Sequence, residues 1–492
     1  MSFERLAPEL VDDILAHASK SMPPKRVKAL RTVCHAFEAA LAPRFFAALT
    51  VVLGGSQRDM LEAVARGQTG WTKHTRTLKV VVKRSKANMV PLVTRVLNAL
   101  PEIGTASLTF NTLSIPRPAL SVIFTHLARS LTTLHITFKD LADNGINWHA
   151  FTCGPAWPRL PLLHTLRLSF DDPQQWEYAG SDICDALLRA DSTRDLTTLH
   201  VYAPHPDPDG FPGPPVQLSA VYDALGTPRL KHVTLPPGML DAVSLRDLTH
   251  LAVTGKGELD PAVWTALADA RARITELRLP VIGTGLGEYL ETYSGLEVLV
   301  VDLDYYEETA TLDMRLLTAL TNHAATMRVL AVRAQYGGCW SFGPQMAGEV
   351  SKLVNLRVLV ASVDIDRVPW AEGMAPAQVV DNAVEHFATT MAHLPHLNHA
   401  ALLQTLGPGL HGGRDSGAIM CHEQHARRAI EDAFDALPLS AAVPGRVGPV
   451  VFAARALYHH TPVDGGMAKW EVLQQITRGK FAKEAVPAFA RI

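Results

Sequence analysis

A short apolar template recurs along most of this chain, and it constrains the fold more than any other feature. The template is Leu-x-x-Leu-x-[Leu/Val/Ile], whose last two apolar positions are spaced as in a β-strand that buries one face. Clear copies are Leu131-Leu134-Ile136, Leu163-Leu166-Leu168, Leu196-Leu199-Val201, Leu230-Val233-Leu235, Leu248-Leu251-Val253, Ile274-Leu277-Leu279, Leu296-Leu299-Val301 and Met327-Leu330-Val332. Weaker copies lie at Leu78-Val80, Leu108-Phe110, Leu356-Leu359-Ala361 and Leu397-Ala400-Leu402. Because the copies are mostly separated by twenty-odd to thirty-odd residues, we expect stacked units instead of one compact core.

Segments with helical periodicity lie between many of the copies. They cover residues 119–131, 183–188, 262–272, 312–324 and 379–394. One strand-helix unit cannot bury its apolar face alone, whereas stacked units share a continuous core. The template is the strand signature of a leucine-rich repeat, although the Asn or Cys that usually follows it is mostly absent. A doubly wound α/β enzyme would instead carry a glycine-rich phosphate loop after an early strand, and the sequence has none.

The first fifty residues carry a different pattern. Leu10, Val11, Ile14, Leu15 and Ala18 recur at helical spacing, and a second helical run extends from Val27 to Leu41. Pro23-Pro24 and Pro43 bound this second run. Three short helices cannot bury all of their apolar surface among themselves, so we expect part of it to be covered by another chain.

This N-terminal segment resembles an F-box. Leu6, Glu9, Leu10, Ile14, Val33, Cys34 and Phe37 match the family pattern, and Arg44-Phe45-Phe46 is similar to its closing aromatic signal. The segment departs from the pattern at Ala7, where the family has a Pro that is here shifted to Pro8, and at Phe37, where Trp is commoner. The stretch between Ile14 and Val33 is also a few residues longer than is usual in the family. The resemblance implies docking to an SKP-type adaptor of cullin-RING ubiquitin ligases. The adaptor-binding residues would be Leu6, Pro8, Glu9, Leu10, Ile14, Leu15, Val33, Cys34 and Phe37. The alternative is a helical cap on the following domain, with these residues as its core.

The expected architecture is therefore an α/β repeat protein with three parts. Residues 1–50 form a three-helix F-box-like module, residues 51–405 an irregular leucine-rich-repeat solenoid, and residues 406–492 a C-terminal cap with a Gly-rich loop. A separate C-terminal domain is the alternative for the last part. F-box proteins commonly carry such a repeat array, which presents their target.

The predicted target-binding surface is the concave strand face with the loops that follow the strands. Charged and aromatic residues gather there at Asp302, Asp304, Tyr305, Tyr306, Glu307, Glu308, Arg333 and Tyr336. A solvated loop is the alternative for the acidic run. The predicted function is target recognition for a ubiquitin ligase. The first alternative is a repeat-built interaction scaffold outside any ligase, and a weaker one is an enzyme whose site the sequence does not reveal.

Charge is unevenly distributed along the chain. Between Lys20 and Arg95 there are fifteen Lys or Arg against three acids, although the whole chain has a net charge of −2. Such a region could hold nucleic acid, an anionic surface or an acidic protein, or be a solvated face. No aromatic interleaving or nucleic-acid motif favours the first option, so we expect no nucleic-acid partner.

Nothing in the sequence predicts an enzyme, a cofactor or a metal site. The five cysteines are widely separated, which favours a reducing compartment, and we expect an intracellular protein, cytoplasmic or nuclear, without a membrane segment. His393, His396 and His399 are spaced three apart, but Pro395 interrupts them and prevents a shared helix face. No nucleophile, paired carboxylates or phosphate-binding loop is evident.

Overall fold

A computed structural model describes most of the chain between Leu10 and Gln475. The ranges that it leaves undescribed are 1–9, 12, 16, 18–22, 24–25, 27–28, 55, 84–88, 112–116, 140–159, 172–194, 203–229, 236–244, 255–258, 304–313, 335–339, 364–372, 374, 406–415, 438–439, 442–449, 454–455, 464–466 and 476–492. After Leu437, only backbone is described. The contacts group the chain into two compact units, Met1–His232 and Val233–Ile492, which we call unit 1 and unit 2.

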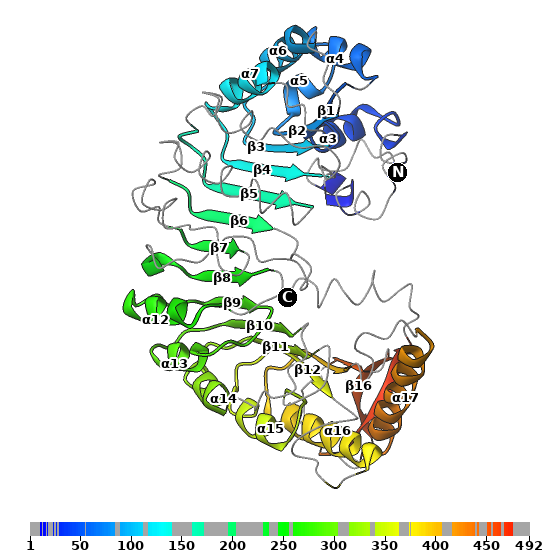
Figure 1. The fold of residues 1–492 in the computed structure, drawn as a ribbon. Helices are drawn as coiled ribbons and strands as arrows, with labels where there is room; N and C mark the ends of the chain where they lie inside the picture. Colours follow the sequence, from blue (N-terminus) through cyan, green and yellow to red (C-terminus); the bar gives the residue numbers. More distant parts are fainter. Residues whose placement is uncertain are drawn as a thin grey trace. The chain divides into compact units, whose positions relative to one another are not determined.

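From Ala48 to Phe138, unit 1 alternates strands with helices (Figure 1). Its strands pair in parallel in the order in which they occur in the chain, from β1 to β6. Its elements are α3 (His35–Phe45), β1 (Ala48–Leu53), α4 (Arg58–Ala65), α5 (Trp71–His74), β2 (Thr77–Val82), α6 (Val90–Ala99), β3 (Thr105–Phe110), α7 (Arg117–Leu127), β4 (Thr133–Phe138), β5 (Thr165–Phe170) and β6 (Thr198–Tyr202). Strand β7 (His232–Leu235) begins at the boundary between the units.

The strands of unit 1 bury one face and leave the other partly open. Along β2 to β5 every second residue is buried, and the residues between them are half-buried or exposed. The buried positions include the apolar template positions that lie within these strands and one further residue in each strand, such as Phe138. At the ends of the strands, the ring of Phe138 stacks between Phe110 at 5.4 Å and Phe170 at 5.0 Å. These rings extend the core from repeat to repeat.

A recurring set of hydrogen bonds joins successive repeats at the start of most described strands. Two consecutive backbone N–H groups donate to one carbonyl of the preceding repeat, as Thr132 and Thr133 do to Gly104. The Thr132 hydroxyl donates to the same oxygen at 3.0 Å. Thr275 of unit 2 repeats this arrangement, with its hydroxyl 3.1 Å from the carbonyl oxygen of Thr249. Threonine hydroxyls therefore provide bonds between repeats in a chain that mostly lacks the usual Asn.

Unit 2 continues the alternation and ends in antiparallel strands (Figure 1). Strands β8 to β13 and β15 pair in parallel, and β15, β16 and β17 pair in antiparallel fashion. Its elements are η5 (Leu245–Asp247), β8 (His250–Val253), α12 (Pro261–Asp269), β9 (Glu276–Leu279), α13 (Leu286–Glu291), β10 (Val298–Leu303), α14 (Met314–Thr321), β11 (Val329–Ala334), α15 (Pro344–Val350), β12 (Val358–Val363), α16 (Pro376–His393), β13 (His399–Gln404), α17 (Ser416–Asp435), β14 (Ser440–Ala441), β15 (Val450–Ala453), β16 (Ala456–Val463) and β17 (Met467–Gln475).

The middle strands of unit 2 are apolar on both faces. All six residues of β12 are buried. Besides the template positions, a second cluster of buried residues joins β10 to β13, consisting of Val300, Ala331, Val358, Val360 and Ala401. A parallel strand that is covered on both faces reads as a continuous apolar run, as β12 does. The strand faces of the two units therefore differ in chemistry.

A buried histidine fixes the chain between α13 and β10. His323 follows α14 and has no exposed surface. Its Nδ1 accepts hydrogen bonds from the backbone N–H groups of Gly295 at 3.1 Å and Leu296 at 3.0 Å. Because Nδ1 accepts, the neutral ring carries its proton on Nε2, which donates to the Leu290 carbonyl at 3.2 Å. Burial lowers the pKa of His323, which keeps this ring neutral.

The structure confirms the predicted α/β fold of repeated strand-helix units. The helices predicted over 119–131, 262–272, 312–324 and 379–394 correspond to α7, α12, α14 and α16. Their observed ends differ from the predicted ones by one to four residues. The helix predicted over 183–188 and most of the Gly-rich loop, residues 406–415, lie outside the described residues. The three-part domain division stays a prediction.

Candidate functional site

The first helical residues that the structure describes form two apolar faces, of which one is buried and the other is exposed. Val11 and Leu15, four residues apart, are almost fully buried, whereas Leu10 and Ile14 are 53% and 50% exposed. Residues four apart lie on the same face of a helix, so one apolar face points into the protein and another meets solvent. An amphipathic helix with no further partner would normally carry polar residues on its outer face.

The inner face belongs to a small core of its own. Val11 and Leu15 cluster with Phe37 and Leu41 of α3, and Leu30, Cys34 and Ala40 pack against this cluster. Val33 lies in the turn immediately before α3 and is 65% exposed. Leu10, Ile14 and Val33, which we call the outer apolar residues, are three of the five large exposed hydrophobic residues in the described part of the chain.

Aromatic contacts attach these helices to the sheet of unit 1. The Arg31 guanidinium lies over the rings of Phe45 at 4.5 Å and Phe46 at 4.4 Å. The same guanidinium forms two hydrogen bonds with Glu38, at 2.9 and 2.7 Å, and these hold the pKa of the Glu38 carboxyl below its usual value. Phe46 meets Trp71 edge-on at 5.1 Å, and the Trp71 indole N–H donates to the carbonyl of Ala48 in β1.

This junction requires a glycine at position 70. A Cβ atom on Gly70 would overlap ring atoms of Phe46. The ring cannot simply withdraw, because it lies between the Arg31 guanidinium and Trp71. The segment Arg44-Phe45-Phe46, which the sequence marks by its similarity to a family signal, therefore joins the helices to the repeats.

The structure places the predicted adaptor-binding residues in three groups. Leu6, Pro8 and Glu9 lie outside the described residues. Leu10, Ile14 and Val33 are exposed, and Cys34 is half-buried. Leu15 and Phe37 lie in the small core and support the helices from inside. The spacing of Leu10 with Ile14 and of Val11 with Leu15 already contains this division into two faces, but the sequence does not say which face points outward.

The predicted target-binding residues are mostly outside the described part of the chain. Asp304, Tyr305, Tyr306, Glu307, Glu308 and Tyr336 fall within undescribed ranges. The backbone of Asp302 lies in β10, where it pairs in register with Arg333 of β11. Arg333 is exposed. The role of this set stays a prediction.

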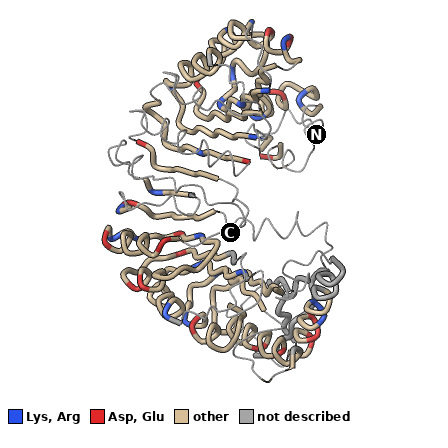
Figure 2. The backbone as a smooth tube through the Cα atoms, viewed as in Figure 1, with Lys and Arg blue, Asp and Glu red and all other residues tan. Residues whose placement is uncertain are grey.

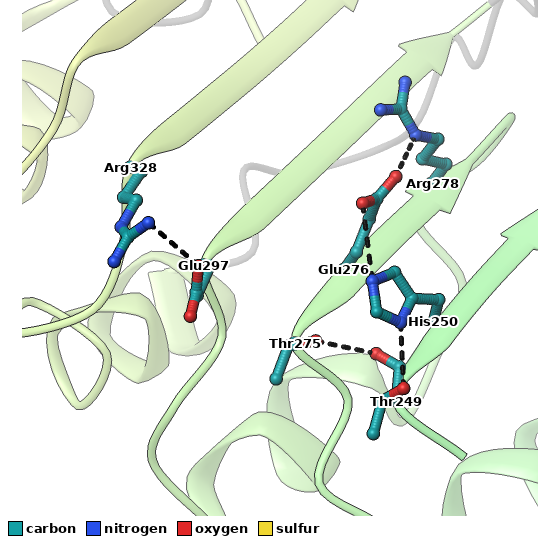
Figure 3. A network of polar contacts seen from close by, with 7 residues as sticks. All are labelled: Thr249, His250, Thr275, Glu276, Arg278, Glu297 and Arg328. Atoms are coloured by element: carbon teal, nitrogen blue, oxygen red, sulfur yellow. Dashed lines mark hydrogen bonds and ion pairs between the residues drawn. The ribbon is translucent and has the colours of Figure 1, made fainter. Parts of the chain in front are cut away.

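A polar network lies where strands β8 to β11 begin (Figure 3). Glu276 accepts a hydrogen bond from Arg278 at 2.7 Å, and its other oxygen lies 3.8 Å from Nε2 of His250 on β8. The Thr249 hydroxyl lies 2.8 Å from Nδ1 of His250. Arg328 approaches Glu297 at 3.5 Å. The two arginines of this network face its two carboxylates, so these four charges cancel within the network.

Charges on the helices of unit 2 are also arranged in opposite pairs. Figure 2 shows both signs along the tube from α12 to α15. Arg315 of α14 pairs with Glu288 and Glu291 of α13, and Lys352 pairs with Glu349 at 2.8 Å. Pairs of this exposure contribute little stability and leave little net field. No group of three His, Cys, Asp or Glu among the described residues is arranged to hold a metal ion.

The sequence matches no known protein-family model and no curated protein. Among the helices that the structure describes, none has the length and apolar character needed to cross a membrane.

Proposed function

We propose that this chain is a non-catalytic recruiting subunit. In this proposal the N-terminal helices dock onto an SKP-type adaptor of a cullin-RING ubiquitin ligase, and the leucine-rich-repeat-like strands and loops bind a protein target. Ubiquitin transfer is then carried out by other subunits, and this chain contributes proximity. The SKP-type adaptor is proposed as the partner because the first fifty residues resemble an F-box.

The observation that carries the proposal is the exposure of the outer apolar residues. Leu10, Ile14 and Val33 lie beside a packed core that already uses Val11 and Leu15. Complete burial of a fully exposed side chain of this kind is worth about 1.5–3 kcal/mol. Because Leu10, Ile14 and Val33 are 53%, 50% and 65% exposed, the three together supply about 2.5–5 kcal/mol of the roughly 8 kcal/mol of a micromolar complex. Part of that energy is offset by the cost of association.

A repeat-built scaffold outside any ligase is the second candidate. It is favoured by the contacts of Arg31, Phe46 and Trp71, which attach the N-terminal helices to the sheet as a cap would be attached. The scaffold reading explains why Leu15 and Phe37 are buried. It gives no reason for apolar side chains on the outer side of the same helices.

Co-purification of the full chain with an SKP-type adaptor separates the two candidates. The test variant is the triple change Leu10→Asp, Ile14→Asp and Val33→Asp, at exposed positions where a charge does not enter the core. The matched control is Leu162→Asp with Val354→Asp, at the other two large exposed hydrophobic residues, 44% and 47% exposed. The proposal requires a complex that survives in the control and disappears in the triple variant. If the wild-type chain does not retain the adaptor, the ligase proposal is wrong and the scaffold function replaces it.

A further inference from the structure

One row of side chains crosses the partly open strand face of unit 1. The register of β2 to β6 aligns Lys79, Ser107, His135, Arg167 and His200, one residue from each strand. Lys79 and Arg167 are exposed, and the other three are half-buried. Since neighbouring strands lie about 4.8 Å apart, the row is about 19 Å long. We call it the cationic row.

The rows on both sides of it carry no negative charge. Toward the beginning of the strands lie Thr77, Thr105, Thr133, Thr165 and Thr198, and toward their ends lie Val81, Thr109, Thr137, Ser169 and Tyr202. None of these aligned strand positions is Asp or Glu. Lys83, Lys139 and Asp171 directly follow β2, β4 and β5, so the ends of the strands add further positive charge overall. This face presents cations and hydroxyl donors, which together bind oxyanions.

The arginine of the row is held in a defined orientation. Cζ of Arg167 lies 4.4 Å from the centre of the Tyr202 ring, and the His200 ring stacks on the same tyrosine at 6.1 Å. Stacking uses the flat side of a guanidinium and leaves the N–H groups at its edge in the plane where a carboxylate or phosphate binds with two hydrogen bonds. Because part of the side-chain entropy is already lost, an anion binds at lower cost.

The positive charges of the row act on one another. Burial lowers the pKa of His135, and Arg167 beside it lowers that pKa further. The pKa of His200 is lowered by burial and then by Arg167, His232 and His135. An anion placed over the row would remove this repulsion and favour the charged form of both rings.

The cationic row is not a general property of the repeats. In unit 2, the corresponding positions near the strand starts pair His250 and Arg278 with Glu276 (Figure 3). Farther along unit 2, β10 to β13 use the same face for the apolar cluster that contains Val300 and Val360. Charge complementarity to an anionic partner is therefore confined, among the described strands, to unit 1.

We propose that the strand face of β2 to β6 binds an extended peptide segment of a partner protein that carries several carboxylate or phosphate groups. This inference rests on the proposed function and gives the target its chemical class. A row of about 19 Å matches about six extended residues, whose alternate side chains point to the same side. A nucleic-acid strand fits less well, because binding along a single strand uses a series of aromatic stacking platforms, and Tyr202 is the one Phe, Tyr or Trp among the aligned positions of this face.

Fluorescence anisotropy with the full chain and short labelled probes tests the proposal. The probes are an eight-residue peptide rich in Asp and Glu, a peptide with two phosphoserines, a neutral peptide of the same length and an oligothymidine. We expect at least one anionic peptide to bind about tenfold or more tightly than the neutral one, and the tighter of the two identifies the anion as carboxylate or phosphate. Equal binding of charged and neutral peptides overturns the proposal, as does an oligothymidine that binds more tightly than both anionic peptides.

Charge removal locates the site. The double variant Lys79→Gln, Arg167→Gln should weaken the anionic peptide about tenfold, whereas Arg315→Gln with Lys352→Gln, which removes two exposed cations from unit 2, should not. Equal effects of the two variants contradict the assignment. The Lys79→Gln, Arg167→Gln variant should still retain the adaptor, so loss of peptide binding and failure of the adaptor proposal are separate results.

A pH series tests the two histidines of the cationic row specifically, and not only the effect of positive charge in general. The Asp/Glu peptide should bind more tightly as the pH falls from about 7.5 to 6, because binding raises the pKa of His135 and His200 and takes up protons while the carboxylates stay ionised. The variant His135→Gln, His200→Gln should bind with less pH dependence. If its pH dependence equals that of the wild type, the two imidazoles do not face the anion.

Discussion

Replacing His323 tests how unit 2 holds its chain between α13 and β10. His323→Leu keeps an apolar body of similar size but leaves three backbone groups without their partner, the N–H groups of Gly295 and Leu296 and the carbonyl of Leu290. An orphaned buried polar group costs about 1–3 kcal/mol. Gly295 is partly accessible, so we expect a loss of about 3 kcal/mol in the free energy of unfolding of unit 2.

His323→Asn is the matched control. The side-chain oxygen of Asn can occupy the position of Nδ1 and accept the bonds from Gly295 and Leu296, while the donor to Leu290 is lost. We expect about half the loss seen for Leu. Hydrogen exchange of the full chain reports the effect locally, because the amides of Gly295 and Leu296 should exchange faster in both variants, and most in His323→Leu. A loss below about 1 kcal/mol in His323→Leu would refute the role assigned to this ring.

The same histidine makes the stability of unit 2 depend on pH. Its pKa is lowered in the folded protein by burial, and no charged group contributes to the shift. The unfolded chain therefore binds the proton more readily, so the stabilisation is complete above the unfolded pKa of about 6.5 and is lost as the pH falls toward the folded pKa. The slope for one such group is at most about 1.4 kcal/mol per pH unit. His323→Asn should remove this part of the slope, and an unchanged slope would contradict the argument.

Substitutions at four further positions probe the packing of the repeats and their junction with the N-terminal helices. Phe138→Ala removes the middle ring of the Phe110–Phe138–Phe170 stack and should cost about 3–5 kcal/mol in urea unfolding, against about 1 kcal/mol for Phe138→Leu. A Cβ atom at Gly348 in α15 would meet no atom within 4 Å, so Gly348→Ala should stabilise the protein by about 0.4–1 kcal/mol. A Cβ atom at Gly70 would overlap Phe46, so Gly70→Ala should destabilise the protein by about 1–3 kcal/mol. If the two substitutions change the stability in the same direction, the geometry described for these glycines is contradicted. Tyr293→Phe removes the hydroxyl that donates to the Ile274 carbonyl at 2.9 Å and should lower the stability measured by thermal unfolding by about 1 kcal/mol. An unchanged stability would show that this hydrogen bond is absent in solution.

The repeat architecture could be predicted because its signal is local and periodic. The template residues Leu134 and Ile136 are buried as their spacing predicts, and so are their counterparts in other repeats wherever the structure describes the side chain. The ends of the helices were less predictable, since they depend on contacts with the neighbouring repeats. The cross-repeat bonds of Thr132 and Thr275 were missed because a threonine that precedes a strand has no distinctive sequence signal.

The surfaces were harder to predict for a physical reason. His135 lies 56 residues after Lys79 in the sequence and 32 residues before Arg167, and only the register of the strands brings the three into one row. The sequence shows an excess of positive charge between Lys20 and Arg95. It does not show that positive side chains from later strands line up with this region on one face of the sheet. In the same way, helical spacing separates Leu10 and Ile14 from Val11 and Leu15, but the packing of α3 decides which pair is covered.

The role of the N-terminal helices is tested most directly by hydrogen exchange of the full chain with and without an SKP-type adaptor. The account predicts slower exchange over residues 10–17 and 29–36 when the adaptor is present at about 50 μM, with the amides of β12 unchanged as an internal reference. Protection that disappears with Leu10→Asp, Ile14→Asp and Val33→Asp would assign the contact to the outer apolar residues. Identical exchange over residues 10–36 with and without the adaptor, in a chain whose β12 amides show that it is folded, would contradict the account.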